Sequence, residues 1–243
     1  MDKINLNLAI RSLLLAAVLG GLALPAHAQA PASGCNVNLD QVRLSNPLSH
    51  IAKKLVNFEP ITIVAIGSSS TAGSGASSPA ANYPSRLAIE LKQLFPTHSI
   101  TVLIRGVGGE EVGDMLKRFD SAVVAARPDL VLWQFGTNSV IRDQMFTDHG
   151  AAIRDGLNKI RSTGADIVLI DPQFAPKVIA KSEAEHMVEL IATTAKVENV
   201  DLFRRYDVMK RWHEVDHLGF ETFVSPSPRP PSGRRCRRPP CRI

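Results

Sequence analysis

The chain is poor in cysteine, which argues against a disulfide-stapled domain and a cysteine-ligated metal protein. Its 243 residues include three cysteines, of which Cys236 and Cys241 lie within the last 19 residues and Cys35 lies near the start. The body of the chain therefore contains no cysteine pair. No Cys-x-x-Cys motif and no His/Cys cluster has metal-ligand spacing. We expect no bound metal ion and no cofactor.

The apolar run near the N-terminus is too short to span a bilayer comfortably. It covers residues 13–24, follows Lys3 and Arg11, and precedes Ala-His-Ala at residues 26–28. A basic start, an apolar core and an Ala-x-Ala site are typical of a secretory signal peptide. We predict that residues 1–28 are removed and that the protein is exported, periplasmic or secreted, without stable membrane insertion after cleavage. Cys35 in "ASGC" would suit a lipoprotein, but it lies well beyond the apolar core.

A basic surface on the folded domain is missing as well. The net charge is +5, but residues 225–243 hold six arginines and no acid, and residues 1–28 contribute +1. Removing both leaves −2 for residues 29–224, so the positive charge belongs to the two ends of the chain. A nucleic-acid-binding footprint on the domain is not supported. The composition, 44% hydrophobic and 21% charged, is that of an ordinary globular protein.

The sequence does contain a regular alternation of apolar and amphipathic segments. Short apolar runs rich in β-branched residues predict strands, and apolar residues at helical spacing predict helices. The predicted strands cover residues 61–67, 99–106, 128–136, 165–172 and 200–203. The predicted helices cover residues 83–95, 110–126, 146–163, 181–197 and 204–217.

This order of segments predicts an α/β fold. Strands that are apolar on both faces, each followed by a helix, indicate parallel βαβ units. Five such units predict three layers, α/β/α, around a flavodoxin-like five-stranded parallel sheet in a single domain of residues 57–224. Residues 29–56 form an N-terminal approach segment, and residues 225–243 form a Pro/Arg-rich tail. No internal repeat or linker divides the domain.

Three glycine-rich loops follow the first three predicted strands. They read GSSSTAG from residue 67, GVGGEE from residue 106 and GTNS from residue 136. Because ligands bind outside the carboxyl ends of parallel strands, we expect these loops to converge on one site. The first loop lacks the Lys-Ser/Thr pair of a P-loop and the G-x-G-x-x-G spacing, which argues against a phosphate cradle. Its position between a buried strand and a helix argues against a linker.

A serine held in a tight turn after a buried strand is typical of a nucleophile. Attack by its hydroxyl creates an oxyanion, which backbone N–H groups and side-chain amides stabilise. The glycines of the GVGG stretch have no Cβ that would block access to their backbone N–H groups, and Asn138 provides a side-chain amide. The three loops therefore favour acyl transfer through a serine.

The motifs IGSSST, RGVGGE and GTNS, in this order after parallel strands, resemble those of the SGNH (GDSL-like) hydrolase superfamily. The resemblance covers residues 57–224. It implies that Ser69 is the nucleophile, and that the amides of Ser69 and Gly109 and the side chain of Asn138 form the oxyanion hole. Ser68 stands where the superfamily has Asp, so Ser68 and Ser70 stay open as alternative nucleophiles.

The superfamily also has an Asp three residues before a His near its C-terminus, and this pair is missing. The Asp orients the imidazole, which takes the proton of the serine. No His or Asp occurs beyond Ser225, where the chain reads SPSPRPPSGRRCRRPPCRI. A segment of this composition cannot bury a core and is expected to be disordered. We hypothesise that a frameshift after about Pro226 replaced the original C-terminus.

The segment RWHEVDHLGF (residues 211–220) holds the candidates for a substitute base, His213 and His217, with Asp216 beside His217 and Glu214 three residues before it. Charged runs on helices are usually solvated surfaces, so a structural role is the stronger interpretation there. The other histidines considered lie on or beside predicted helices or at the opposite edge of the sheet: His98, His149 and His186.

Three more residues have structural explanations, and the role of a fourth stays open. Trp133 within the third strand is expected to pack in the core, and Glu110 and Glu111 suit the start of a helix, where the macrodipole favours negative charge. Asp171 ends the fourth strand near the loops, where lining a pocket and forming a turn are both open roles.

These observations predict an exported serine esterase that hydrolyses carboxylic esters through a Ser69 acyl-enzyme and is impaired by the loss of its catalytic His and Asp. The alternative is a non-catalytic protein of the same fold that binds an ester or a glycan. In either case, we expect the partner to be a small-molecule or glycan-linked ester. The sequence leaves open the acyl group, the alcohol and the oligomeric state.

The frameshift hypothesis predicts that the nucleotides across codon 225 encode an Asp-x-x-His motif in a neighbouring frame. Resequencing the source DNA checks this. A clean reading frame whose neighbours lack the motif contradicts the hypothesis.

Overall fold

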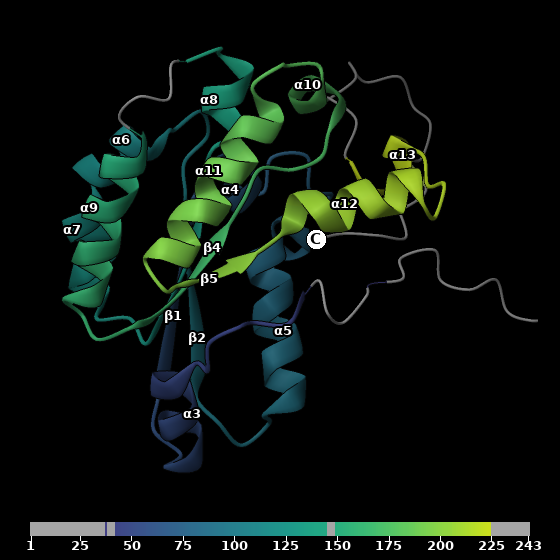
Figure 1. Ribbon diagram of the computed structural model, residues 1–243. Coiled ribbons are helices and arrows are strands. Elements are labelled where there is room, and N and C mark those ends of the chain that lie inside the picture. The colour runs from purple at the N-terminus through teal and green to yellow at the C-terminus, as the bar shows by residue number, and fades with distance from the viewer. Residues whose placement is uncertain (1–36, 38–41, 145–148, 225–243) are drawn as a thin grey trace, which may run out of the picture. The chain divides into compact units, whose positions relative to one another are not determined.

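The structure, a computed structural model, describes residues 37, 42–144 and 149–224. Its sheet has five parallel strands in the order β2-β1-β3-β4-β5, which confirms the predicted α/β fold of flavodoxin-like type (Figure 1). β1 and β2 are in register as far as Gly67 opposite Gly106, so these two strands end at the same level. The strands are β1 (Ile61–Gly67), β2 (Ile100–Gly106), β3 (Leu130–Gln134), β4 (Asp166–Ile170) and β5 (Asp201–Phe203).

Long helices follow the strands as predicted, with shifts of a few residues at their ends. α5 begins after Asn82, whose Oδ1 accepts a hydrogen bond from the N–H of Ser85 at 2.8 Å, and Pro84 occupies its first turn. The sequence did not predict the helix of the approach segment, α3. The long helices are α3 (Ser49–Val56), α5 (Tyr83–Leu94), α9 (His149–Arg161), α11 (Ala184–Val197) and α12 (Arg205–Glu214).

Short helices form most of the loops at the carboxyl ends of the strands. Most of these were not predicted, because one turn of helix has too few residues to show a periodic apolar pattern. The short helices are α4 (Ser69–Ala72), α8 (Thr137–Ile141), α10 (Pro176–Ile179), α13 (Phe220–Phe223) and the 3-10 turn η1 (Pro79–Ala81).

The single helix predicted for residues 110–126 is wrong. The segment divides into α6 (Val112–Lys117), α7 (Phe119–Ala122) and the 3-10 turn η2 (Val124–Ala126). Two side chains, one on each side of the break at Arg118, contact the same indole. Nε1–H of Trp133 lies 3.3 Å from Sδ of Met115, and the ring centroids of Phe119 and Trp133 are 5.0 Å apart. Trp133 is fully buried, as expected of a core residue.

The sheet buries apolar side chains on both faces, because successive residues of a strand point to opposite sides. Along β1, Val64 and Ile66 belong to the core shared with α6, α9 and α11, whereas Ile61 and Ile63 belong to the core shared with α3 and α5. Figure 1 shows α7 and α9 on one side of the strands and α5 on the other. The three-layer arrangement follows from this two-sided burial.

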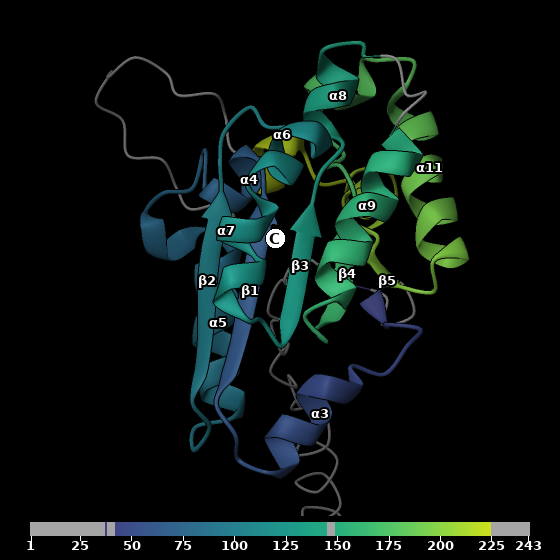
Figure 2. The same ribbon diagram turned by 90° about the vertical axis from the view of Figure 1, so that its left-hand side faces the viewer.

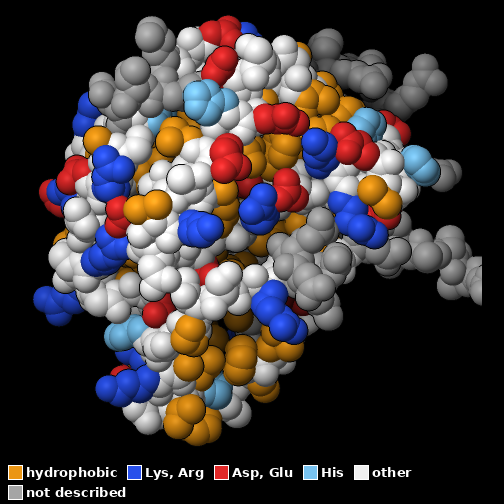
Figure 3. All heavy atoms as spheres, viewed as in Figure 1, with side chains coloured by type: hydrophobic (Ala, Val, Ile, Leu, Met, Phe, Trp, Pro, Cys, Tyr) orange, Lys and Arg blue, Asp and Glu red, His pale blue; other side chains and the backbone are white. Residues whose placement is uncertain are grey.

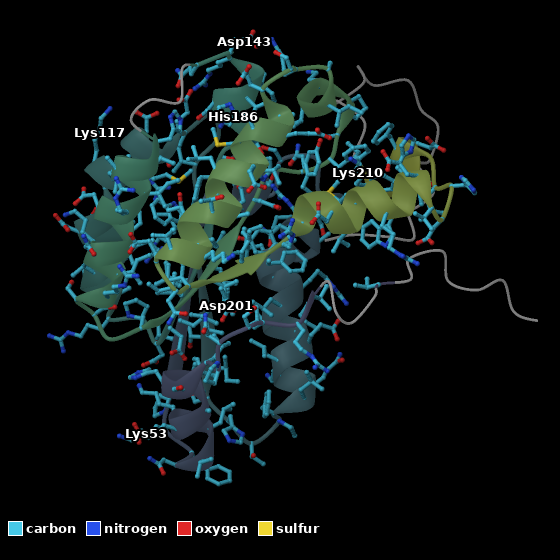
Figure 4. All side chains as sticks on the ribbon, viewed as in Figure 1. Lys53, Lys117, Asp143, His186, Asp201 and Lys210 are labelled. Carbon is cyan, nitrogen blue, oxygen red and sulfur yellow. The ribbon has the colours of Figure 1, made fainter. Side chains whose placement is uncertain are left out.

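Carboxylates at the start of the strands attach α3 to the sheet. The two carboxylate oxygens of Asp166 accept hydrogen bonds from the N–H groups of His50 at 3.3 Å and Ile51 at 2.9 Å, in the first turn of α3. Lys53 of this helix and Asp143, which follows α8, mark opposite ends of the molecule (Figure 4). The approach segment therefore contributes a helix to the amino edge of the sheet.

Asp129 is the most heavily hydrogen-bonded of these carboxylates. Its side chain is 6% exposed and accepts from the N–H of Thr62 at 2.7 Å, from Nζ of Lys54 at 2.8 Å and from the ring of His50 at 2.8 Å. Burial by itself raises the pKa of Asp129, but the hydrogen bonds from Lys54, Thr62 and His50 outweigh burial and hold the pKa below its usual value.

Positive and negative side chains are interspersed over the face in view in Figure 3. That face carries no broad patch of lysine and arginine of the kind that binds nucleic acid. Within residues 42–144 and 149–224 no helix is long and apolar enough to cross a bilayer. The predicted signal peptide and the Pro/Arg-rich tail lie outside the described residues, so both stay predictions.

We predict that Asp129→Asn lowers the unfolding free energy by about 2 kcal/mol at pH 7, because charge-assisted hydrogen bonds are lost. A carboxylate whose folded pKa is depressed stabilises the fold above its unfolded pKa, and this contribution disappears as the pH falls through the folded pKa. The difference between wild type and variant should therefore shrink below about pH 4. Urea denaturation followed by circular dichroism measures it, with Asp155→Asn on the exposed face of α9 as control. A difference that stays constant down to pH 3 contradicts the assignment.

Candidate active site

The loops after β1 and β2 pack directly against each other. A Cβ at Gly106 would lie 2.1 Å from the backbone nitrogen of Ala72 and 2.5 Å from the carbonyl carbon of Thr71, so a side chain at Gly106 is excluded. The N–H of Val107 also donates to the carbonyl of Gly67 at 3.0 Å. The structure therefore brings the serine turn and the GVGGEE loop together at the carboxyl edge of the sheet, where α4, α6 and α8 lie (Figure 2).

The loop after β3 joins the GVGGEE loop through one side chain. Nδ2 of Asn138 donates to the backbone carbonyl of Glu110 at 2.7 Å. Gly109, immediately before Glu110, has a φ of +81°, a conformation that favours glycine. Gly136, just before α8, has a φ of +92°, which likewise favours glycine. Ser69, Gly109 and Asn138 thus lie on three loops that contact one another in sequence.

The three consecutive serines have different surroundings. Ser68 is 2% exposed, and both its N–H and its hydroxyl lie 3.2 Å from Oε1 of Gln134. The hydroxyl of Ser70 donates to Oε1 of Gln173 at 2.8 Å. Ser69 begins α4 and is partly exposed, and within the described part of the chain its hydroxyl has no hydrogen-bond partner. Of the three hydroxyl groups, only that of Ser69 is neither buried nor engaged in this region.

Gln134 is a functional candidate that the sequence analysis missed. It is fully buried at the end of β3, and its Oε1 accepts from Ser68 and, at 3.3 Å, from the hydroxyl of Thr71. A Cβ at Gly67 would lie 2.9 Å from the same Oε1. One amide oxygen therefore holds the start of the serine turn. The signal was available in the sequence, since Gln134 is the only strongly polar residue between Leu130 and Gly136.

A second layer of buried polar groups supports this turn. The hydroxyls of Thr71 and Tyr83 lie 3.2 Å apart, and burial raises the pKa of Tyr83. Arg205 is 5% exposed at the start of α12, where burial lowers the pKa of its guanidinium while the charge of Asp171 opposes that shift. Thr71 and Tyr83 are thus joined by a hydrogen bond, whereas Arg205 acts on Tyr83 and Asp171 through its charge.

Asp171 is a structural residue in this arrangement. It has no exposed surface, and its Oδ1 accepts from the N–H of Tyr206 at 2.9 Å in the first turn of α12. Burial raises the pKa of Asp171 to about 7, although the Tyr206 hydrogen bond and the charge of Arg205 act in the opposite direction. The sequence left open lining a pocket and forming a turn, and the contacts show a third role, anchoring the start of α12.

None of the described hydrogen bonds joins a histidine to Ser69. Nδ1 of His213 lies 3.0 Å from the carbonyl of Leu218, and its ring stacks on Phe220 with centroids 4.1 Å apart. His217 is exposed. The other histidines considered contact groups outside the serine turn: His98 contacts Leu55, His149 contacts Ser139 and His186 contacts Glu183.

The two glutamates after Gly109 have different roles. Glu111 is the N-cap of α6 and forms a reciprocal capping box with Asp114, as the expected position at a helix start implies. Glu110 instead forms an ion pair with Arg118. No group of three or more His, Cys, Asp or Glu side chains suited to a metal ion occurs among the residues that the structure describes.

Comparisons with known proteins place the chain in a family. A model of the non-GDSL lipase-like family matches residues 34–229. Among solved structures, acetylxylan esterase Axe2 of Geobacillus stearothermophilus is 18% identical with a TM-score of 0.55 over 64% of this chain and 81% of that one. TesA is 20% identical with a TM-score of 0.52 over 58% of this chain and 76% of that one. No curated protein matches. The family match confirms the SGNH-type resemblance, and the structural likenesses show the same fold.

We predict that Gln134→Leu lowers the unfolding free energy by about 3 kcal/mol, because Ser68 and Thr71 lose their buried acceptor. Gln93→Leu, on the exposed side of α5, is the matched control and should change stability by less than about 0.5 kcal/mol. Chemical denaturation of both variants measures the difference. Equal stability of the two variants would show that Gln134 does not hold the turn.

Proposed function

The chain belongs to the non-GDSL lipase-like family, and from this premise we propose that it is a serine hydrolase acting on carboxylic esters. The observation that carries the proposal is the Ser69 hydroxyl, unengaged among the described residues at the point where three loops meet. Ser68 and Ser70 are disfavoured as nucleophiles because their hydroxyls are bonded to Gln134 and Gln173.

In the proposed reaction, Oγ of Ser69 attacks the ester carbonyl carbon, its hydroxyl proton passes to solvent water, which later returns a proton to the departing alcohol, and the carbonyl oxygen becomes an oxyanion. The N–H groups of Ser69 and Gly109 and the amide of Asn138 donate to this oxyanion. The intermediate then expels the alcohol, which takes a proton, and leaves an acyl-enzyme. Water attacks the acyl group in the same way and releases the acid. Each donor of such an oxyanion hole typically contributes about 100- to 1000-fold to the rate.

We propose that the reaction is slow in this chain, because its sequence lacks the Asp-x-x-His pair that would accept the serine proton. Without a triad base the serine is a weak nucleophile, and only the stabilisation of the oxyanion accelerates its attack. The similarity in fold to an acetylxylan esterase suits a small or glycan-linked ester as substrate. We further propose that the protein is exported, in accordance with its N-terminal sequence.

The second candidate function is binding without turnover. It is favoured by the described hydrogen bonds of the histidines, none of which joins a histidine to Ser69. Such a protein would hold an ester or a glycan at the same three loops. The two functions differ in one respect: only the enzyme depends on the Ser69 hydroxyl.

Hydrolysis of p-nitrophenyl acetate by the purified full chain tests the proposal. We expect turnover above the rate in buffer, abolished by Ser69→Ala and lowered about 100-fold by Asn138→Ala. Ser68→Ala and Ser70→Ala are the matched controls and should retain most of the rate.

Turnover that survives Ser69→Ala would contradict the proposed nucleophile. Absence of turnover with retained binding of an acetylated oligosaccharide by both wild type and Ser69→Ala would favour the binding protein.

A further inference from the structure

The guanidinium of Arg118 binds the loop that carries Gly109. Nε of Arg118 donates to both carboxylate oxygens of Glu110 at 2.8 and 2.9 Å, and its Nη2 donates to Oε2 at 2.5 Å. Nη2 also donates to the backbone carbonyl of Arg105 at 2.9 Å. Arg118 therefore connects the end of β2 to the residue that follows Gly109.

This ion pair is shielded from water. The side chains of Arg118 and Glu110 are 21% and 14% exposed, whereas those of the surface pair Lys117 and Asp114 on the same helix are 78% and 47% exposed. An Arg–carboxylate pair with several charge-assisted hydrogen bonds fixes geometry as well as adding energy. A mobile surface pair would fix nothing, so the shielding makes the Arg118–Glu110 pair a suitable anchor.

The backbone carbonyl of the same Glu110 receives the hydrogen bond of Asn138 at 2.7 Å. A side-chain amide has two N–H donors held in one plane. When the first is bonded to the Glu110 carbonyl, the direction of the second is determined. The position of Glu110 therefore sets the direction in which Asn138 presents its remaining donor.

We propose that Arg118 is a positioning residue of the oxyanion hole. It fixes Glu110, whose carbonyl orients the Asn138 amide toward the oxyanion that forms on attack by Ser69. This proposal rests on the proposed function for its catalytic consequence. The orientation of Asn138 itself does not depend on turnover and is measured separately.

Arg118→Lys is the informative variant. Lysine keeps the positive charge and can bond to Glu110, but its ammonium lacks the planar fork that reaches both carboxylate oxygens and the Arg105 carbonyl together. We expect kcat for p-nitrophenyl acetate to fall about 10-fold while KM stays within about 2-fold, because misplacement of an oxyanion donor weakens the transition state more than the ground state.

A chemically equivalent pair elsewhere provides the control. Nη1 of Arg161 donates to the Glu198 carboxylate at 2.9 Å, and its Nη2 donates to the Glu198 backbone carbonyl at 2.6 Å. These residues lie at the ends of α9 and α11, on the amino edge of the sheet and away from the loops. Arg161→Lys should leave kcat and KM unchanged, although it makes the same substitution in a similar ion pair.

A double-mutant cycle separates positioning from a general loss of stability. In the Asn138→Ala background, Arg118→Lys should lower kcat by less than about 2-fold, because the group it orients is already gone. Losses that multiply, about 10-fold in both backgrounds, would overturn the proposal.

The side-chain amide resonances of Asn138 give a readout that needs no catalysis. In ¹⁵N-labelled protein, assigned by comparison with Asn138→Ala, Arg118→Lys should shift this pair and speed its hydrogen exchange, and Arg161→Lys should leave it unchanged. Unchanged Asn138 resonances in Arg118→Lys would overturn the proposal. If no variant hydrolyses the ester while the resonances respond as expected, the proposed function fails and the orientation of Asn138 by Arg118 stands.

Discussion

The close contact between Gly106 and the backbone of α4 is the constraint on which the site depends. β1 and β2 end in register, and with only 2.1 Å between a virtual Cβ and the nitrogen of Ala72, the second loop crosses directly beside the serine turn. Asn138 then extends the contact to the third loop through the Glu110 carbonyl. Any residue with a side chain at 106 would push the GVGGEE loop away from the serine turn, whatever the rest of the sequence.

Buried polar groups contact the serine turn on its side facing the sheet. Gln134 accepts hydrogen bonds from the start of the serine turn and from Thr71, whose hydroxyl also contacts Tyr83, and Asp171 separately anchors the first turn of α12. Buried polar groups of this kind are costly unless they are paired, so they tend to specify one arrangement of the elements around them. Hydrogen bonds thus hold Ser68, Ser70 and Thr71 on either side of Ser69, while the Ser69 hydroxyl itself is engaged by none of the described residues.

The sequence predicted the elements whose signal is local. An apolar β-branched run that meets a glycine predicts β1 at 61–67, and the shared direction of parallel strands predicts that the glycine loops lie at one edge. Contacts between distant residues carried no such signal. Neither Gln134 bonding to Ser68 nor Arg118 bonding to Glu110 follows from spacing, and the contacts of Met115 and Phe119 with Trp133 join residues of different elements.

The most direct test of the account is to locate the residue that reacts with a fluorophosphonate. The full chain is treated for hours, digested with trypsin and examined by tandem mass spectrometry of the peptide covering residues 55–86. The account predicts an adduct on Ser69, formed faster in the folded chain than in the urea-unfolded chain, because the folded loops stabilise the developing charge without a triad base. Labelling of Ser68 or Ser70, or equal rates in both states, would contradict it.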